Sequence, residues 1–225
     1  MKSDAKLHSR ENNGLLAVPE KIALNWLARK MPSKIHSDHL TVIGLTAMIA
    51  AGLSFWLSAT YKEALFLVIF FLAVNWFGDS LDGTLARYRN CQRPRYGYYV
   101  DHVVDLIGTS ALIGGIALSG FMSPLIAVAL LATFSLVEAE VFLATHVQKL
   151  FRLSCFGFGP TELRVLISVG AIYVYKQPTV QIGNLGNFLL FDVGGILAIA
   201  GLLTAFVYSA VRNTRRLYIA EPRGL

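Results

Sequence analysis

The sequence predicts an all-α integral membrane protein, a six-transmembrane-helix bundle with an N-terminal amphipathic interfacial helix. Two observations predict this class. Of the 225 residues, 55% are hydrophobic and only 15% are charged, whereas charged residues make up about a quarter of an ordinary soluble domain. The apolar residues are also gathered into long runs separated by short polar stretches, as in a multispan helical membrane protein.

The first part of the chain has two segments of different character. Residues 1–18 are polar, have no hydrophobic period and contain no apolar core of a signal peptide, so we expect a disordered tail. Residues 19–34 carry an apolar stripe with basic residues beside it. The stripe consists of Ile22, Ala23, Trp26 and Leu27, and the basic residues are Lys21, Arg29 and Lys30. This pattern predicts an amphipathic helix that lies on a membrane surface.

The six expected spans lie in one domain, residues 35–213. Their ranges are 39–58, 63–88, 97–118, 124–147, 160–176 and 188–211. Each is near the roughly 20 residues that cross about 30 Å of hydrocarbon, although the fifth is short. Pro124 and Pro160 open the fourth and fifth spans, where proline suits the first helical turn. Residues 214–225 are expected to form a cytoplasmic tail.

The distribution of Lys and Arg residues indicates the orientation in the membrane. If the span ends alternate between two sides, one side receives all 20 Lys and Arg residues except Lys62 and Lys176. Cytoplasmic loops carry such an excess, so this side, with both termini, is predicted to be cytoplasmic. The bias accounts for the net charge of +6 and suits anionic lipid. Basic residues spread along a membrane rim argue against nucleic-acid binding.

Four carboxylates stand at the ends of two neighbouring spans. Asp79 and Asp82 are three residues apart at the end of the second span, and Asp101 and Asp105 are four apart at the start of the third. Each spacing places a pair on one helix face. Buried acids without partners are costly, so their convergence favours a site for divalent cations held by oxygen ligands. The alternative is an interhelical network of Asp and Arg side chains.

Small residues continue both acidic faces. Gly83 and Ala86 follow the first pair, and Gly97 precedes the second, so another helix or a flat ligand can approach the backbone closely. Arginines are expected to form the rim: Arg87, Arg89, Arg93 and Arg95. This combination suits a metal-bound diphosphate with a nucleotide base or sugar beside it.

The segment from Asp79 to Asp105 resembles the signature of the CDP-alcohol phosphotransferase (CDP-alcohol phosphatidyltransferase) family. That signature is Asp-x2-Asp-Gly-x2-Ala-Arg, a gap, and Gly-x3-Asp-x3-Asp. Every fixed residue is present: Asp79, Asp82, Gly83, Ala86, Arg87, Gly97, Asp101 and Asp105. The gap, residues 88–96, is one residue longer than usual, and it falls in a basic loop where an insertion is tolerated.

The resemblance implies a membrane enzyme of phospholipid synthesis. Such an enzyme transfers a substituted phosphate from a CDP-alcohol to the hydroxyl of an acceptor alcohol and releases CMP. By similarity, Asp79, Asp82 and Asp101 are expected to hold two Mg²⁺ or Mn²⁺ ions, and Asp105 is expected to complete this metal site, to act as general base, or to do both. Gly83, Ala86, Arg87 and Gly97 then border the CDP moiety. Family members are commonly homodimers, so a homodimer is expected.

Two further features resemble the choline and ethanolamine phosphotransferase branch. His102 follows Asp101, although Tyr98 stands where that branch has a Glu, and a Thr161-Glu162 pair opens the fifth span. His102 is therefore expected to deprotonate or position the acceptor hydroxyl. This favours a CDP-aminoalcohol donor and a diacylglycerol-like acceptor. The alternative is a CDP-diacylglycerol donor with a small polar alcohol as acceptor.

Five other polar residues are weaker candidates for contact with substrate: Glu138, Glu140, His146, Glu162 and Arg164. Glu138 and Glu140 lie in the middle of a span, and two residues apart they cannot share a helix face. Glu162 also suits a helix start for a purely structural reason, because acidic side chains are favoured in a first turn.

Two rival functions use similar acids. A Mg-dependent membrane prenyltransferase also binds a diphosphate through Asp-rich helices, but it lacks the Gly-x2-Ala-Arg and Gly-x3-Asp-x3-Asp spacings. A carboxylate-site cation transporter would place its acids near the midplane of the membrane. Here the acids cluster at one face beside arginines, which favours a phosphate ligand.

Overall fold

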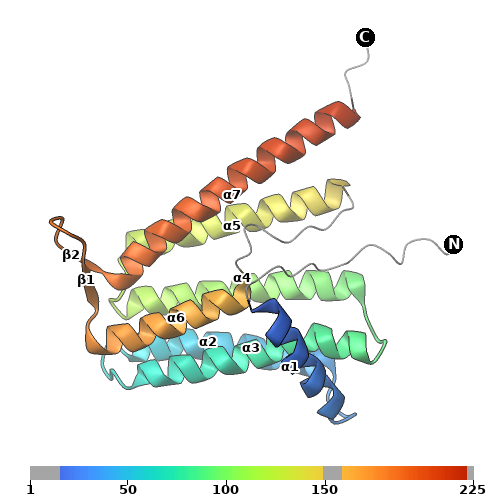
Figure 1. Cartoon of the computed structure of the whole chain (residues 1–225), viewed down its shortest axis with the longest axis horizontal. Coiled ribbons are helices and arrows are strands. Elements are labelled where there is room, and N and C mark those ends of the chain that lie inside the picture. The colour runs from blue at the N-terminus through green and yellow to red at the C-terminus, as the bar shows by residue number, and fades with distance from the viewer. Residues whose placement is uncertain (1–15, 149–158, 222–225) are drawn as a thin grey trace.

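The computed structural model describes residues 16–148 and 159–221, which form seven helices and one hairpin (Figure 1). The elements are α1 (Ala17–Lys30), α2 (Ser37–Leu57), α3 (Ala64–Tyr88), α4 (Pro94–Leu118), α5 (Pro124–Gln148), α6 (Pro160–Lys176), β1 (Thr179–Gln181), β2 (Asn187–Leu189) and α7 (Leu190–Ala220). The expected disordered tail, residues 1–18, falls almost entirely outside the described residues.

The prediction of an all-α membrane bundle with a short N-terminal helix is confirmed. Among the described residues, five helices are long and apolar enough to cross a membrane: α2, α3, α4, α5 and α7. The expected fifth span is present as α6 with the expected bounds, but it has only 17 residues. At about 1.5 Å per residue it covers roughly 25 Å, less than the approximately 30 Å of a hydrocarbon core.

The interfacial helix expected over residues 19–34 is α1, Ala17–Lys30, and two details of the C-terminal part also differ from the sequence-based expectation. Helix α7 continues to Ala220, so residues 214–220, expected as part of a tail, extend this helix. The connection between α6 and α7 contains a small antiparallel hairpin in which Thr179 pairs with Leu189. Its strands have three residues each, which is too short to leave an alternating pattern in the sequence. The turn uses Gly183 and Gly186 at φ values of +49° and +109°, a region that favours glycine.

Helix α2 packs closely against both α3 and α4. Glycines make both contacts close. A Cβ added to Gly78 of α3 would lie 2.6 Å from the backbone nitrogen of Gly44, and one added to Gly115 of α4 would lie 2.0 Å from the carbonyl oxygen of Gly52. Small residues at such positions let helix backbones touch. The Gly44–Gly78 contact lies directly beside Asp79, so it fixes this acid against α2.

Helix α1 has two apolar faces. One face packs Leu24 and Ala28 against Leu81 and Leu85 of α3, in a cluster that also includes Leu40. The other face exposes the side chains of Val18, Ile22 and Trp26. The predicted interfacial helix is thus also attached to the bundle, where it packs against α3 (Figure 1).

Candidate active site

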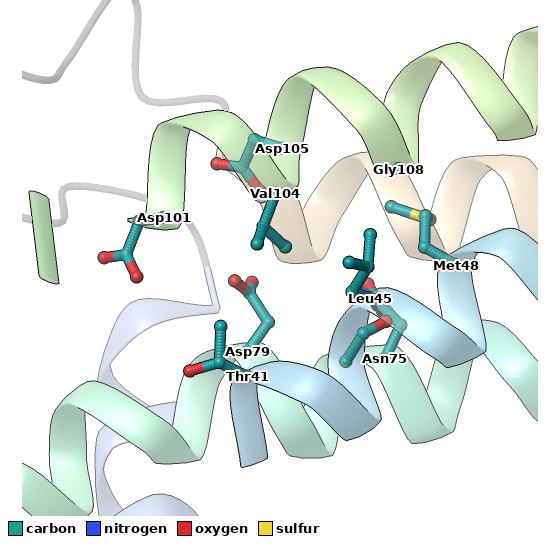
Figure 2. A pocket seen from close by; sticks show the side chains of 10 residues that line it. Thr41, Leu45, Met48, Asn75, Asp79, Asp101, Val104, Asp105 and Gly108 are labelled. Atoms are coloured by element: carbon teal, nitrogen blue, oxygen red, sulfur yellow. Dashed lines mark hydrogen bonds between the residues drawn. The ribbon is translucent and has the colours of Figure 1, made fainter. Parts of the chain in front are cut away.

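A narrow pocket lies between α2, α3 and α4, and three carboxylates line it: Asp79, Asp101 and Asp105. Figure 2 shows Asp79 on α3 facing Asp101 and Asp105 on α4. The remaining lining residues are Thr41, Gly44, Leu45, Met48, Asn75, Val104 and Gly108. The expectation that two helix faces bring their acids together is therefore met for three of the four.

The fourth acid, Asp82, is buried beside this pocket and does not line it. Its Oδ2 accepts a hydrogen bond from the Thr41 hydroxyl at 2.6 Å, and its Oδ1 accepts one from the Gly83 backbone N–H at 2.5 Å. Asp82 still lies within electrostatic range of Asp79 and Asp101. The four acids thus form one cluster of negative charge. Sequence reasoning had assigned no role to Thr41.

The donor set of this cluster fits hard divalent cations such as Mg²⁺ or Mn²⁺, which prefer carboxylate oxygens. In residues 16–148 and 159–221, no three Asp, Glu, His or Cys side chains are grouped closely enough to hold a metal ion as they stand. The feature that suits a cation is therefore the shared pocket and its excess of negative charge. Asp105, for example, lies within electrostatic range of three other carboxylates, those of Asp79, Asp101 and Glu138, and of the Arg164 guanidinium.

Arg164 of α6 supplies a positive charge to this cluster. Its Nη2 donates to Asp79 Oδ2 at 2.5 Å, and its Nε donates to Asn75 Oδ1 at 2.6 Å. Asn75 in turn donates from Nδ2 to the Gly44 carbonyl oxygen at 2.9 Å. Arg164 is buried, and its Nη1 has no hydrogen-bond partner in the part of the chain that the structure describes. These contacts join α6, α3 and α2 at the pocket.

Sequence reasoning included Arg164 only as a weak candidate and missed Asn75. A signal for Asn75 was present, since it lies four residues before Asp79 and therefore on the same helix face. A polar amide in an otherwise apolar helix interior needs a partner. The identity of that partner, an arginine 89 positions further along the chain, was visible only in the fold.

The small residues of the motif border open space. A Cβ added to Gly97 would meet nothing within 4 Å, and one added to Gly83 would meet only the guanidinium of Arg87, at 3.3 Å. Packing therefore does not require glycine at either position, in contrast to Gly78. Ala86 is half-buried on the same stretch of α3, and Arg87 is exposed. The space beside these residues suits a bound ligand.

Two arginines of the expected rim have structural contacts. Arg89 donates hydrogen bonds to three backbone carbonyl oxygens between α1 and α2: Met31, Pro32 and Ile35. Arg93 forms an ion pair with Asp38 in the first turn of α2. Both side chains hold the start of α2 against the loop between α3 and α4.

His102 faces helix α5 and is not among the residues that line the pocket. Its Nδ1 lies 2.6 Å from the backbone carbonyl oxygen of Tyr98. Its ring centroid lies 4.1 Å from that of Tyr98 and 4.9 Å from that of Phe142 on α5. One turn of α4 thus presents Asp101 to the pocket and the neighbouring histidine to a different surface.

The structure separates the five weaker candidates. Arg164 contacts the acids directly, and Glu138 lies within electrostatic range of Asp105. Glu140 instead accepts a hydrogen bond from Asn213 of α7 at 2.7 Å. Glu162 accepts hydrogen bonds from the backbone N–H groups of Gly159 and Leu16, both at 3.0 Å, at the starts of α6 and α1. His146 is exposed near the end of α5.

The comparisons with known proteins agree with this architecture. A model of the family described as CDP-alcohol phosphatidyltransferase matches residues 35–207. No curated protein matches the chain at a significant level. Among solved structures, the chain is similar to the crystal structure of Mycobacterium tuberculosis phosphatidylinositol phosphate synthase (PgsA1) with CDP-DAG bound. The TM-score is 0.51 at 19% sequence identity, over 88% of this chain and 92% of that one. This likeness shows a shared fold.

Proposed function

We propose that the acidic pocket is the reaction site of this chain, which belongs to the CDP-alcohol phosphatidyltransferase family. Members of this family are membrane enzymes of phospholipid synthesis that transfer a substituted phosphate from a CDP-alcohol and release CMP. The observation that carries the proposal is the meeting of Asp79, Asp101 and Asp105 on one pocket, with Arg164 beside them. By this proposal, Asp79, Asp82, Asp101 and Asp105 would hold two divalent cations.

The proposed reaction is an attack of the acceptor hydroxyl oxygen on the phosphorus nearest the alcohol of the donor. A new phosphorus–oxygen bond forms, the bond to the CMP oxygen breaks, and the hydroxyl proton passes to Asp105. Divalent cations at the acids would neutralise charge on the transferring phosphoryl group. Asp105 is preferred as the base because it lines the pocket, whereas His102 packs against α5. The open side of Gly83 and Gly97 leaves room for the CDP moiety.

For the donor, we propose CDP-diacylglycerol, with a small polar alcohol as the acceptor. The solved structure with the same fold contains CDP-DAG, which supports this choice over a CDP-aminoalcohol. The two residues that favoured the aminoalcohol branch give it less support in the fold. His102 is engaged with Tyr98 and Phe142, and Glu162 accepts hydrogen bonds at two helix starts.

The proposed orientation places the acidic pocket and both termini at the cytoplasmic face. The support is the bias of the Lys and Arg residues toward one side, together with the position of the motif at the adjoining ends of α3 and α4. A homodimer remains a prediction from the family resemblance.

A substrate panel tests the proposed function. Purified protein is incubated with Mn²⁺ or Mg²⁺ and either CDP-diacylglycerol plus small polar alcohols, or CDP-choline and CDP-ethanolamine plus diacylglycerol, and the products are identified by mass spectrometry. CMP and a new phospholipid are expected only with CDP-diacylglycerol. A product only from a CDP-aminoalcohol would overturn the choice of donor.

Thermal unfolding in detergent tests the reaction class. Stabilisation by prenyl diphosphate but not by CDP would contradict the reaction class.

Replacement of the motif glycines by alanine is expected to reduce activity without loss of stability. In Gly97→Ala the added methyl group enters open space, and in Gly83→Ala it meets the flexible end of the Arg87 side chain at 3.3 Å. Each methyl group therefore competes with a ligand for the space beside the motif. Turnover should fall by at least about tenfold, since small misplacements at a reaction site have large effects. Gly114→Ala is the matched control on α4, because a Cβ there also meets nothing within 4 Å. Equal activity losses in all three variants would contradict a ligand beside the motif.

A further inference from the structure

Glu20 of α1 joins three helices through one carboxylate oxygen. Its Oε1 accepts hydrogen bonds from Trp76 Nε1 at 2.8 Å, from Ser80 Oγ at 3.2 Å and from Thr161 Oγ1 at 2.7 Å. Trp76 and Ser80 lie four residues apart on one face of α3, and Thr161 lies in the first turn of α6. One carboxylate oxygen that accepts from both other helices fixes α1, α3 and α6 relative to one another.

The three donors adjoin the candidate active site. Ser80 directly follows Asp79, and Thr161 precedes Arg164 by less than one helical turn. Arg164 in turn donates to Asp79 Oδ2 at 2.5 Å. The contacts of Glu20 therefore hold together the two helices whose side chains form this ion pair.

Other contacts attach α1 to the same two helices. Glu162 of α6 accepts a hydrogen bond from the Leu16 backbone N–H at 3.0 Å. Further along α1, Leu24 and Ala28 pack against Leu81 and Leu85 of α3. Apolar packing alone does not fix the exact position of α1, because it is non-directional. The hydrogen bonds of Glu20 and Glu162 fix that position.

We infer that Glu20 is a positioning residue for the transfer reaction, because it holds α6 against α3 so that Arg164 reaches Asp79 and Asn75. This inference rests on the proposed function, which assigns the acids and Arg164 to the reaction site. Glu20 itself touches neither the pocket nor its lining residues among the described contacts. It acts through Arg164, and the interfacial helix is thereby a part of the active-site framework.

Kinetics of Glu20 variants test the inference at saturating Mn²⁺. Glu20→Ala is expected to lower kcat/KM by about tenfold, a loss of the size expected when hydrogen-bond donors lose their acceptor. Glu20→Gln keeps an oxygen acceptor and should stay within about twofold of the wild type. The matched control is Glu63→Ala, which removes an exposed acid outside the site and should leave kcat/KM unchanged. A loss in Glu20→Gln as large as in Glu20→Ala would overturn the inference.

A double-mutant cycle tests whether Glu20 acts through Arg164. In an Arg164→Lys background, which keeps the charge but lacks the two-point contact with Asp79 and Asn75, Glu20→Ala should cause less than about a twofold further loss, because coupled residues are non-additive. A full tenfold loss in both backgrounds would contradict the proposed route. If Glu20→Ala does not fold, Thr161→Val removes one of the three donors and takes its place in the cycle.

A distance measurement separates this inference from the proposed function. Spin labels at the exposed positions Ile22 and Leu166, with the native cysteines replaced by serine, report the separation of α1 and α6. Glu20→Ala is expected to broaden the distance distribution, and Glu20→Gln to leave it as in the wild type. An inactive wild-type protein would count against the proposed function, whereas an unchanged distribution in Glu20→Ala would overturn the positioning role.

Discussion

Asp105→Asn is expected to lower turnover by roughly 10²- to 10⁴-fold, the contribution of a general base to catalysis, and to leave the fold at least as stable as the wild type. The first part follows from the position of Asp105, whose carboxylate lines the pocket opposite Asp79. The second part follows from its surroundings, since burial and the carboxylates of Asp79, Glu138 and Asp101 disfavour a charge there and together outweigh the attraction of Arg164. An amide in place of the carboxylate removes repulsion between like charges.

Two measurements check this result. Turnover is followed as CMP release with the donor that the substrate panel identifies, and stability as the midpoint of thermal unfolding in detergent. His102→Gln is measured in parallel, because it removes the imidazole of the other candidate base but keeps an N–H group that can donate to the Tyr98 carbonyl oxygen. A larger loss of turnover in His102→Gln than in Asp105→Asn would assign the base to the histidine.

Arg164→Met is expected to lower both stability and activity. Breaking a buried ion pair by removal of one partner costs about 3–5 kcal/mol, and this value is an upper limit here because Asp79 keeps 29% of its side-chain surface exposed. The substitution also leaves the acids without the guanidinium that donates to Asp79 and Asn75. The unfolding midpoint in metal-free buffer should therefore fall by several degrees.

The double variant Asp79→Asn/Arg164→Met is the control for this interpretation. It removes both charges of the ion pair, and a neutral replacement of a buried pair is often tolerated, so the unfolding midpoint should recover toward the wild-type value. Activity should not recover, because Asp79 is one of the proposed metal ligands. A double variant that is no more stable than Arg164→Met would show that the loss of stability does not come from an unpaired charge on Asp79.

The positions of the helices could be predicted from the sequence wherever the length of an apolar run marks a helix. The bounds expected for residues 160–176 and 63–88 lie within one residue of α6 and α3, because an apolar run flanked by Pro, Gly or charged residues marks helix ends directly. The extension of α7 to Ala220 was missed because its last part is rich in charged residues and no longer resembles a span.

Within the site, local spacing was sufficient for Asp79, Asp101 and Asp105, because residues three or four apart on one helix share a face whatever surrounds them. It was not sufficient for His102, whose position next to Asp101 in the chain suggested a place in the same pocket. Successive residues on a helix are rotated by about 100°, so the histidine packs against Phe142 of α5. Nor did spacing reveal that Glu162 supports the starts of α1 and α6.

The sequence by itself determined the membrane class, the number and order of the helices, and the motif that carries the chemistry, because periodicity and motif spacing are properties of one short segment at a time. Only the tertiary structure decided which side chains donate to the acids: Arg164 to Asp79, and Thr41 to Asp82. It also decided that Glu20 links α1 to the helices that carry Asp79 and Arg164. These partners lie on different helices, so the packing that brings them within reach depends on several segments at once and cannot be read from any single one.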